Sequence, residues 1–379
     1  MRVLLVGKYP PCQGGIAAKT YWMSRALAEA GLRFDVVTVV PERYSSRGLA
    51  GQARRQRLVA LKPTQAPWFV PGADLWTERL VSAGLKLAAS IRPDLVEVNY
   101  LAPFGLAGLV LAQSLAVPLL VRHAGSDIAK LLGWVPAARA LTMVLEFATC
   151  VVTPETSPLC FESTAPHRPK VVRLPRYVPD PTAFTPIREK APPGSPLLLF
   201  AGKINYYWRF KALDSLLAAL VLRPDWHLMM VANGTGKEQF MAEVERLELT
   251  TRVTWRDFVH PSEMPRLLAG AGAVWVVDRP GGPQDYSNLV AEAVAVGRPC
   301  LVSRASFDHP DATMFRRYPG LLVVNPEDPT SCALGLDSAC ALHMLEPPSE
   351  MQRAHSDYIQ ANRELYRTLL SPADQRRCS

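Results

Sequence analysis

LLLFAGK at residues 197–203 is the first of four short apolar runs that decide the fold of this chain. The others are HLMMVANGTG at 227–236, AVWVVDRP at 273–280 and CLVS at 300–303. Each run is followed by a polar or glycine-bearing loop and then by a helix-like pattern, which is the alternation of a parallel α/β domain. The sequence therefore predicts a doubly wound sheet for this part of the chain.

Polar residues gather after these apolar runs, where ligands bind in doubly wound sheets. Two lysines, glycine turns and a helix start indicate a diphosphate site, and a carboxylate one turn into the helix indicates sugar hydroxyls. The residues expected there are Gly202, Lys203, Lys211, Asn233, Gly234, Ser287, Asn288 and Glu292. Capping of the helix is an equally good explanation for Ser287 and Asn288, because Ser and Asn are favoured at helix starts.

A chain of 379 residues is long enough for two domains, each with its own core. The boundary is expected in the proline-rich stretch 175–196, between a first domain over 1–180 and a second over 190–349. A helix near 348–370 is expected to return to the first domain, so that 350–379 belongs with it. The seven cysteines are scattered without metal or redox spacing, which indicates reduced thiols and a cytosolic enzyme.

The charge is concentrated in the first half. Residues 1–180 hold 21 Lys and Arg against 12 Asp and Glu, whereas the whole chain carries a formal net charge of +8. A basic first half favours an anionic membrane surface or an anionic substrate, and an ordinary arginine-rich surface is the alternative. No recognition module surrounds the short basic cluster at 54–57, so nucleic acid is not an expected partner.

The chain opens with a strand, a helix and a second strand, at 2–7, 16–30 and 34–40. No G-x-G-x-x-G accompanies them, so a dinucleotide site is not indicated. Gly14 and Gly15 precede the helix, where backbone amides and the positive helix end favour an anion. A plain turn into the helix explains these glycines as well.

His123 directly follows the strand-like run PLLVR, with Asp127 further along the same loop. A histidine at the carboxyl end of a strand is well placed for a site, and a structural histidine that caps the loop is the alternative. Residues 43–75 are expected to be irregular. Within them Trp68 and Phe69 either contact a membrane or acceptor or pack as a surface loop.

The segment 101–121 is almost wholly apolar and nearly long enough to cross a bilayer, which takes about 20 residues. Pro103, Gln113 and Pro118 divide it. A helix over 104–116 and a buried strand over 118–122 are therefore expected in place of a membrane span.

The order and spacing of several motifs resemble the retaining, nucleotide-sugar-dependent family 4 glycosyltransferases over most of the chain. The motifs are GKYPPCQGGIAAKT (7–20), RPDLVEVNYLAPFG (92–105), PLLVRHAGSD (118–127), LLLFAGK (197–203), FKALDSLLAAL (210–220), RVTWRDFVHPSEMPRLLAGAGAVWVV (252–277) and NLVAEAVAVGRPCLVS (288–303). The resemblance implies the GT-B architecture, in which two doubly wound parallel-sheet domains face each other across a cleft.

The resemblance also implies roles for individual residues. Lys203 and Lys211 would hold the diphosphate, Glu292 would grip the ribose, and His123 would lie near the transferred sugar. The implied catalytic set is His123, Lys203 and Lys211, and the implied donor-binding set is Gly14, Gly15, Gly202, Asn233, Gly234, Gln284, Ser287, Asn288 and Glu292.

Gln284 departs from the family pattern, which is a glutamate, seven residues and a second glutamate. The second position holds Glu292, but the first holds Gln284 and Asp285 is one residue out of register. A glutamine can donate and accept hydrogen bonds but carries no charge. The departure therefore leaves open an unusual donor or weak activity.

The function that the resemblance implies is transfer of a sugar from a nucleotide diphosphate sugar, with UDP favoured over GDP, to an acceptor hydroxyl with retention of configuration. No metal and no cofactor beyond the nucleotide sugar are expected. The acceptor is either a lipid-linked glycan or a small-molecule aglycone, and the protein is expected in the bacterial cytoplasm, alternatively at the inner face of the membrane. A phosphorylase or epimerase on the same scaffold and a non-catalytic nucleotide-sugar-binding protein are the alternatives.

Overall fold

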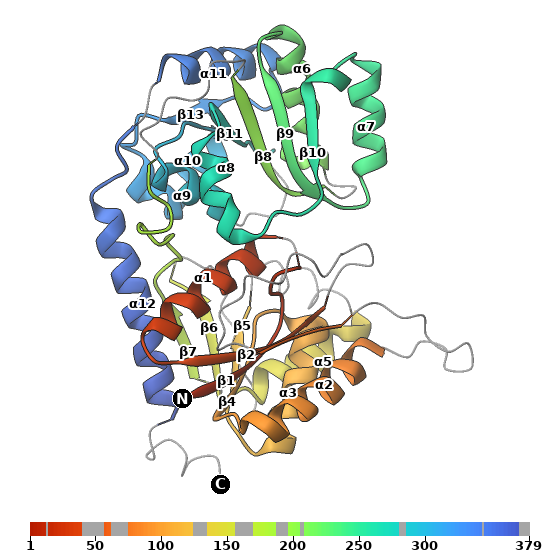
Figure 1. The fold of residues 1–379 in the computed structure, drawn as a ribbon, viewed down its shortest axis with the longest axis vertical. Helices are drawn as coiled ribbons and strands as arrows, with labels where there is room; N and C mark the ends of the chain where they lie inside the picture. Colours follow the sequence, from red (N-terminus) through yellow and green to blue (C-terminus); the bar gives the residue numbers. More distant parts are fainter. Residues whose placement is uncertain are drawn as a thin grey trace, which may run out of the picture. The chain divides into compact units, whose positions relative to one another are not determined.

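The computed structural model describes ten stretches of the chain. They are residues 1–12, 14–39, 57–61, 75–123, 135–155, 170–186, 196–204, 208–279, 286–342 and 345–370. Contacts between residues divide the chain into two units (Figure 1). Unit 1 consists of Met1–Cys12, Ile16–Arg176 and Asp357–Ser379, and unit 2 consists of Gln13–Gly15 and Tyr177–Ser356.

Unit 1 is built on a parallel sheet of seven strands in the order β3-β2-β1-β4-β5-β6-β7. Its strands are β1 (Arg2–Val6), β2 (Arg33–Val39), β3 (Leu58–Leu61), β4 (Leu95–Val98), β5 (Leu119–Arg122), β6 (Cys150–Pro154) and β7 (Lys170–Leu174). The middle strands are buried on both faces, which is typical of a parallel sheet covered by helices on both sides, and the buried residues include the charged Glu97 of β4 and Arg122 of β5.

Helices cover both faces of this sheet (Figure 1). They are α1 (Gly15–Glu29), α2 (Leu75–Ile91), α3 (Leu106–Leu115), α5 (Val135–Glu146) and α12 (Glu350–Leu369). The helices α2, α3 and α5 pack with Leu4, Val96 and Val121 in one apolar core. The opposite face packs against α1 and against α12, whose Tyr366 ring meets Phe34 of β2 at 5.9 Å between centroids.

Unit 2 is built on a parallel sheet of six strands in the order β10-β9-β8-β11-β12-β13. Its strands are β8 (Leu197–Lys203), β9 (His227–Asn233), β10 (Val253–Arg256), β11 (Ala273–Val276), β12 (Cys300–Ser303) and β13 (Leu321–Val324). Strands β8, β9 and β10 follow one another from the centre of the sheet to one edge, and β11, β12 and β13 follow one another from the centre to the other edge. The order of strands therefore reverses between β8 and β11.

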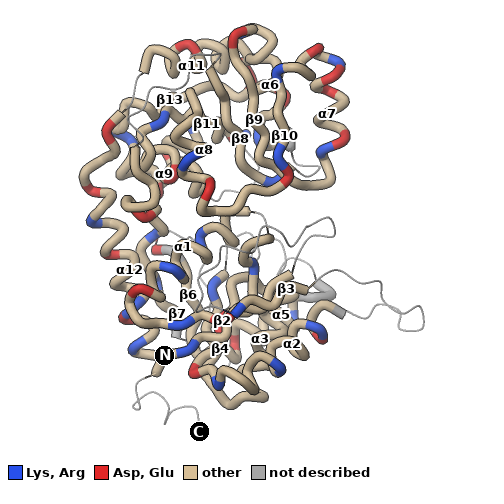
Figure 2. The backbone as a smooth tube through the Cα atoms, viewed as in Figure 1, with Lys and Arg blue, Asp and Glu red and all other residues tan. Residues whose placement is uncertain are grey.

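The helices of unit 2 are α6 (Leu213–Leu222), α7 (Lys237–Arg246), α8 (Met264–Ala269), α9 (Asn288–Ala295), α10 (Arg304–Asp308) and α11 (Pro329–Ala341). One core joins α6, α7 and α11 to the sheet through residues such as Leu216, Phe240 and Leu336. The helix α9 packs with α8 and against β11 and β12. Figure 2 shows acidic and basic positions along α7 and α12, a mixture typical of solvated helix faces.

The expected doubly wound class is confirmed in both units, and the predicted strands and helices lie where the apolar runs placed them. The apolar segment at 101–121 forms a helical turn, then α3 and β5, as expected from its prolines. The expectation that 43–75 is wholly irregular was wrong, because Leu58–Leu61 forms β3. This four-residue edge strand pairs with β2 from Val36 to Val39, and a run so short gives little periodic signal.

Candidate active site

Lys203 and Asn233 stand at the carboxyl ends of two neighbouring strands of unit 2. Lys203 ends β8, Asn233 ends β9, and the parallel register pairs the two residues. Ile204 N donates to Asn233 O at 3.0 Å, which fixes the start of the following loop. Gly234 has a φ of 149°, a backbone conformation that favours glycine. The predicted Lys203, Asn233 and Gly234 therefore lie together at one point of the sheet edge.

Gly202 precedes Lys203 on β8. A Cβ atom added at Gly202 would lie 3.0 Å from Phe200 Cζ on the same strand. The strand therefore accommodates a larger residue there only if the Phe200 ring shifts.

Lys211 lies after β8, at the end of the helical turn Trp208–Lys211. Its Nζ forms an ion pair with Asp278 Oδ1 at 2.7 Å. Its carbonyl oxygen accepts a hydrogen bond from Trp275 Nε1 at 3.0 Å, which ties this turn to β11. A carboxylate from a different part of the chain thus holds the predicted phosphate-binding lysine.

Asp278 follows β11 and was missed by sequence reasoning. The parallel register pairs Ala273 with Leu198 and Val274 with Leu199, and continuing it puts Asp278 level with Lys203. Strands β8 and β11 flank the reversal of strand order, where ligands bind in doubly wound sheets. The place of Asp278 just past an apolar run was a usable signal.

The Lys211–Asp278 pair is partly open to solvent, with side-chain exposures of 34% and 21%. An exposed ion pair contributes only about 0–1 kcal/mol. An anionic ligand can therefore replace Asp278 as the partner of Lys211 at small cost.

Arg279 fixes the loop that carries Asp278. Its guanidinium donates to Asp214 Oδ1 and to Glu327 Oε1, each at 2.7 Å. Its backbone N–H donates to Phe210 O at 2.8 Å, next to Lys211. These bonds join the turn after β8 to the loop after β11, so Arg279 has a structural role in positioning the lysine.

The helix α9 presents the remaining predicted residues of unit 2. Ser287 is its N-cap, because Ser287 Oγ accepts a hydrogen bond from Leu289 N at 3.3 Å. Asn288 is the first helical residue and Glu292 follows one turn later. Capping therefore accounts for Ser287, and the positive end of the helix also favours an anion.

Glu292 is a buried carboxyl, and the residue is only 7% exposed. Burial raises the pKa of Glu292 to about 8. Its carboxyl oxygens form no hydrogen bond or ion pair with other residues in the described part of the chain. At neutral pH the group is therefore a protonated carboxyl that can both donate and accept a hydrogen bond.

His123 is the predicted site residue of unit 1 and follows the last residue of β5. Its side chain is 9% exposed. Burial, and then the charge of Lys19, lower the pKa of His123 to about 4. The imidazole is therefore neutral at pH 7. Sequence reasoning missed Lys19, which lies in the second turn of α1. Its position in the motif gave no sign that it lies close to His123.

Gly14 and Gly15 stand at the start of α1, as predicted. Gly14 has a φ of 125°, which favours glycine, and Gly15 is the first residue of the helix. The division by contacts groups both glycines with unit 2.

Several predicted residues lie outside the described residues. They are Gln284, Asp285, Asp127, Trp68, Phe69 and residues 54–56 of the basic cluster.

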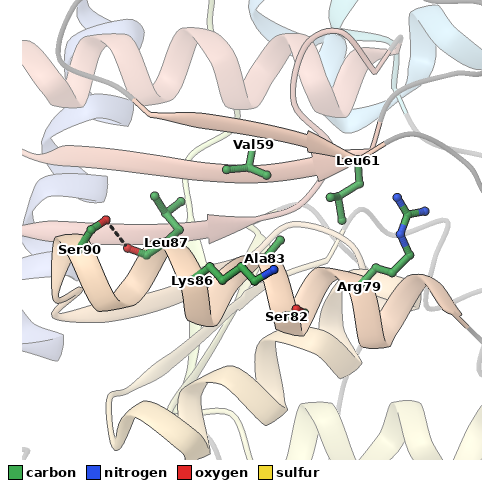
Figure 3. A pocket seen from close by; sticks show the side chains of 8 residues that line it. All are labelled: Val59, Leu61, Arg79, Ser82, Ala83, Lys86, Leu87 and Ser90. Atoms are coloured by element: carbon green, nitrogen blue, oxygen red, sulfur yellow. Dashed lines mark hydrogen bonds between the residues drawn. The ribbon is translucent and has the colours of Figure 1, made fainter.

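A shallow groove of about 510 Å³ lies between β3 and α2 of unit 1 (Figure 3). Its floor is apolar, and Arg79 and Lys86 extend from α2 along it. The lining residues are Val59, Leu61, Arg79, Ser82, Ala83, Lys86, Leu87 and Ser90. The groove contains none of the predicted site residues.

No helix in the described stretches combines the length and the apolar character needed to cross a membrane. Those stretches also contain no group of three or more His, Cys, Asp or Glu side chains arranged to hold a metal ion.

Two doubly wound parallel-sheet units, with Lys203 and the Lys211–Asp278 pair at the strand reversal of the second, are typical of the GT-B class of fold. A model of the glycosyl transferase 4-like domain matches residues 14–157, and a model of glycosyl transferases group 1 matches residues 195–340. Together they match well over half of the chain. The chain therefore belongs to the GT-B glycosyltransferases that combine these two domains.

Solved structures agree with this class. Sucrose-phosphate synthase from Thermosynechococcus elongatus is 18% identical with a TM-score of 0.62, covering 97% of this chain and 99% of that one. HepE from Anabaena, in complex with UDP-glucose, is 14% identical with a TM-score of 0.60, covering 97% and 99%. An α,α-trehalose-phosphate synthase from Burkholderia xenovorans, in complex with glucose-6-phosphate, is 16% identical with a TM-score of 0.58, covering 98% and 100%. A comparison with curated proteins gave no significant match.

Proposed function

We propose that this protein transfers a sugar from a UDP-sugar to an acceptor hydroxyl with retention of anomeric configuration. The observation that carries the proposal is the placement of Lys203 and the Lys211–Asp278 pair at the carboxyl ends of β8 and β11, which flank the strand reversal of unit 2. Membership of the glycosyltransferase family and the UDP-glucose complex of the similar HepE support a nucleotide sugar as donor.

The two lysines act on the diphosphate. As the bond between the sugar and the diphosphate breaks, negative charge grows on the leaving oxygen. Lys203 and Lys211 stabilise that charge, and Lys211 leaves Asp278 to do so. The departing diphosphate takes the proton of the attacking acceptor hydroxyl on the same face of the sugar, which gives retention without an enzyme nucleophile.

The neutral groups orient the donor. Glu292, protonated at neutral pH, hydrogen-bonds the ribose hydroxyls both as donor and as acceptor. The start of α9 at Ser287 and Asn288 faces the phosphates, Gly202 and Gly234 leave room for them, and Gln284 contacts the sugar. His123, also neutral, hydrogen-bonds the transferred sugar, and Gly14 and Gly15 offer backbone amides to the ligand.

We further propose that turnover needs no metal ion, since the lysines supply the positive charge that the diphosphate requires. The acceptor is a lipid-linked glycan or a small-molecule aglycone, and the protein works in the cytoplasm or at the inner membrane surface.

The test is transfer from UDP-sugars to an acceptor panel, followed by NMR of the anomeric proton of the product. We expect a product with the anomeric configuration of the donor, and UDP-sugars to be used in preference to GDP-sugars. An inverted product would contradict the mechanism. Turnover that requires inorganic phosphate, or that proceeds without an acceptor, would instead favour a phosphorylase or an epimerase.

A further inference from the structure

The sheet of unit 1 carries charged residues on the face that α1 and α12 cover. Glu97 of β4 and Arg122 of β5 are buried there, whereas Val96, Val98 and Val121 on the same strands belong to the apolar core of the other face. Successive residues of a strand point to opposite faces, so this separation follows from the sequence alternation. The charged groups therefore lie between the sheet and two helices.

The partners of Glu97 are fixed. Arg122 Nε donates to Glu97 Oε1 at 2.8 Å, and the Tyr366 hydroxyl donates to Glu97 Oε2. Burial, and then the charge of Glu97, raise the pKa of Tyr366 well above its usual value, so its hydroxyl stays protonated. Both carboxylate oxygens of Glu97 therefore already accept a hydrogen bond, one from Arg122 and one from Tyr366.

Lys19 adds a positive charge to this arrangement. Lys19 is half-buried on α1, and its charge interacts with those of Arg122, Arg176 and Glu97. Within the described stretches the ammonium group of Lys19 forms no hydrogen bond and no ion pair. In the described part of the chain, Lys19 therefore lies near Arg122 and near a carboxylate whose two oxygens are already bonded, so Glu97 gives Lys19 no direct ion pair.

These cations stand at the ligand-binding edge of the sheet. Arg122 is the last residue of β5, and Arg176 comes two residues after the end of β7. Thr20, next to Lys19, accepts a hydrogen bond at 2.8 Å from Asn99, the residue after β4. The first turns of α1 thus lie over the carboxyl ends of the strands, where ligands bind in such sheets.

We propose that Lys19 anchors an anion subsite on unit 1 that binds a phosphate or carboxylate group of the acceptor. The bound anion supplies the countercharge that Glu97 cannot give to Lys19. The subsite rests on the proposed function, because it assigns an anionic group to the acceptor of that reaction. It differs from the lysines of unit 2, which serve the donor.

Anion binding at this subsite has a defined pH dependence. Burial, and then Arg122 and Arg176, lower the pKa of Lys19 to about 7, so the free site loses its charge as the pH rises above 7. In the described stretches the other groups that face Lys19 are Glu97, Arg122, Arg176 and His123. The pKa of Arg122 is raised above its usual value, so Arg122 keeps its charge between pH 6 and 9, and His123, with a pKa of about 4, stays neutral. Sulfate also keeps its charge over this range, so its binding reports Lys19.

The first experiment labels lysines of the whole protein with a trace of acetic anhydride and follows each peptide by mass spectrometry. We expect sulfate to slow labelling of Lys19 in a saturable way, with an affinity that weakens by up to tenfold per pH unit above 7. Lys86 on the exposed side of α2 is the matched control and keeps its rate. Unchanged labelling of Lys19, or equal slowing at Lys86, would overturn the proposal.

Three small probes identify the chemistry of the group. Glycerol 3-phosphate, glycerate and glycerol share a three-carbon hydroxylated skeleton and carry a phosphate, a carboxylate and no charge, respectively. We expect one or both anions to protect Lys19 and glycerol to give no protection. Protection by glycerol equal to that by the anions would contradict an anion subsite.

Variants separate the subsite from the donor site. In Lys211→Ala, sulfate is expected to protect Lys19 as in the wild type, because Lys19 belongs to unit 1 and Lys211 to unit 2. Lys19→Gln is expected to keep its affinity for UDP and to raise the KM for an anionic acceptor at least tenfold with a smaller change in kcat, whereas Lys19→Arg restores most of the loss. Intact UDP binding without Lys19 protection would reject the subsite alone, and protection without UDP binding would reject the proposed donor function alone.

Discussion

The pairing of Lys211 with Asp278 changes how the phosphate-binding lysine is understood. The sequence predicted that Lys211 binds the diphosphate, whereas in the structure its Nζ forms an ion pair with Asp278 Oδ1 at 2.7 Å. The partial exposure of both side chains keeps the ion pair weak. Asp278 therefore positions Lys211 and competes with the ligand for it.

Substitution of the pair tests this competition. We expect Lys211→Ala to lower kcat by about 10²–10³-fold, the usual cost of removing a group that stabilises charge in the transition state. Asp278→Asn is the matched variant, and it should bind UDP at least as tightly as the wild type because it frees the lysine from its carboxylate. Titration calorimetry with UDP and steady-state kinetics measure both effects. A Lys211→Ala protein with unchanged kcat would reject the role of the lysine.

The buried carboxyl of Glu292 predicts a pH effect on stability. Its pKa is raised from 4.5 to about 8, so between these values the folded protein holds a proton that the unfolded chain releases. Stability conferred at this position therefore falls as the pH rises from about 4.5 to 8 and is constant above. Glu292→Gln removes the dependence.

We expect the free energy of unfolding of Glu292→Gln, relative to the wild type, to increase over that range, by at most about 1.4 kcal/mol for each unit of pKa shift. Urea denaturation at pH 5, 6.5 and 8 measures the difference. A constant difference across the three pH values would show that Glu292 is ionised in the folded protein.

At the scale of elements, α12 is joined to the sheet of unit 1 by the Tyr366 hydroxyl. Strand β4 supplies Glu97, β5 supplies Arg122, and the end of α12 supplies Tyr366, 269 residues away from Glu97 along the chain. Asn362, also buried, donates to Tyr358 O at 2.7 Å within the helix. The part of α12 from Asp357 onward is therefore part of the unit 1 fold and covers a charged face of its sheet.

Removing the Tyr366 hydroxyl leaves a buried acceptor short of one donor. We expect Tyr366→Phe to lower the free energy of unfolding by about 1–3 kcal/mol, the cost of an unsatisfied buried polar group. Tyr358→Phe removes a hydroxyl from the same helix and leaves both bonds to Glu97 in place, so it should cost less. Chemical denaturation compares the two variants. Equal losses of unfolding free energy would show that the hydrogen bond from Tyr366 to Glu97 adds no stability of its own.

At the scale of the whole molecule, both units have a doubly wound parallel sheet, but different side chains lie at the carboxyl ends of their strands. The edge of unit 2 presents lysines and a helix start, whereas unit 1 presents a neutral histidine beside buried cations. A donor bound by unit 2 stabilises the folded protein by mass action. We expect a UDP-sugar at 100 times its Kd to add about 2.7 kcal/mol to the free energy of unfolding.

A thermal-shift screen of UDP, GDP and their sugars measures this effect on the full chain. The shift should be largest for the true donor and should shrink in Lys211→Ala. A screen in which no nucleotide raises the Tm would contradict a nucleotide-sugar site.

Metal removal is the second test at this scale. We expect turnover after dialysis against EDTA to stay within about twofold of the untreated rate, because two lysines supply the charge that the diphosphate needs. Added Mg²⁺ or Mn²⁺ provides the control. Loss of turnover on chelation, with recovery on adding metal, would reject the metal-free mechanism.

The sequence by itself determined the class of fold and the order of its elements. Leu198, Leu199 and Phe200 of LLLFAGK and all four residues of CLVS are buried, so these runs are apolar whichever helices cover the sheet. The residues that end those runs were predictable as well, because the edge of a parallel sheet follows from strand direction. That is why Lys203, Asn233 and His123 were placed at strand ends from sequence alone.

Only the tertiary structure decided which of these groups meet and how they ionise. Asp278 holds Lys211, Tyr366 reaches Glu97, and Lys19 faces Arg122, although each pair is distant in sequence. The raised pKa of Glu292 and the lowered pKa of His123 come from burial, which no local pattern records. The physical reason is that contact and desolvation depend on how sheets and helices pack, whereas hydrophobic periodicity reports only which face each residue takes.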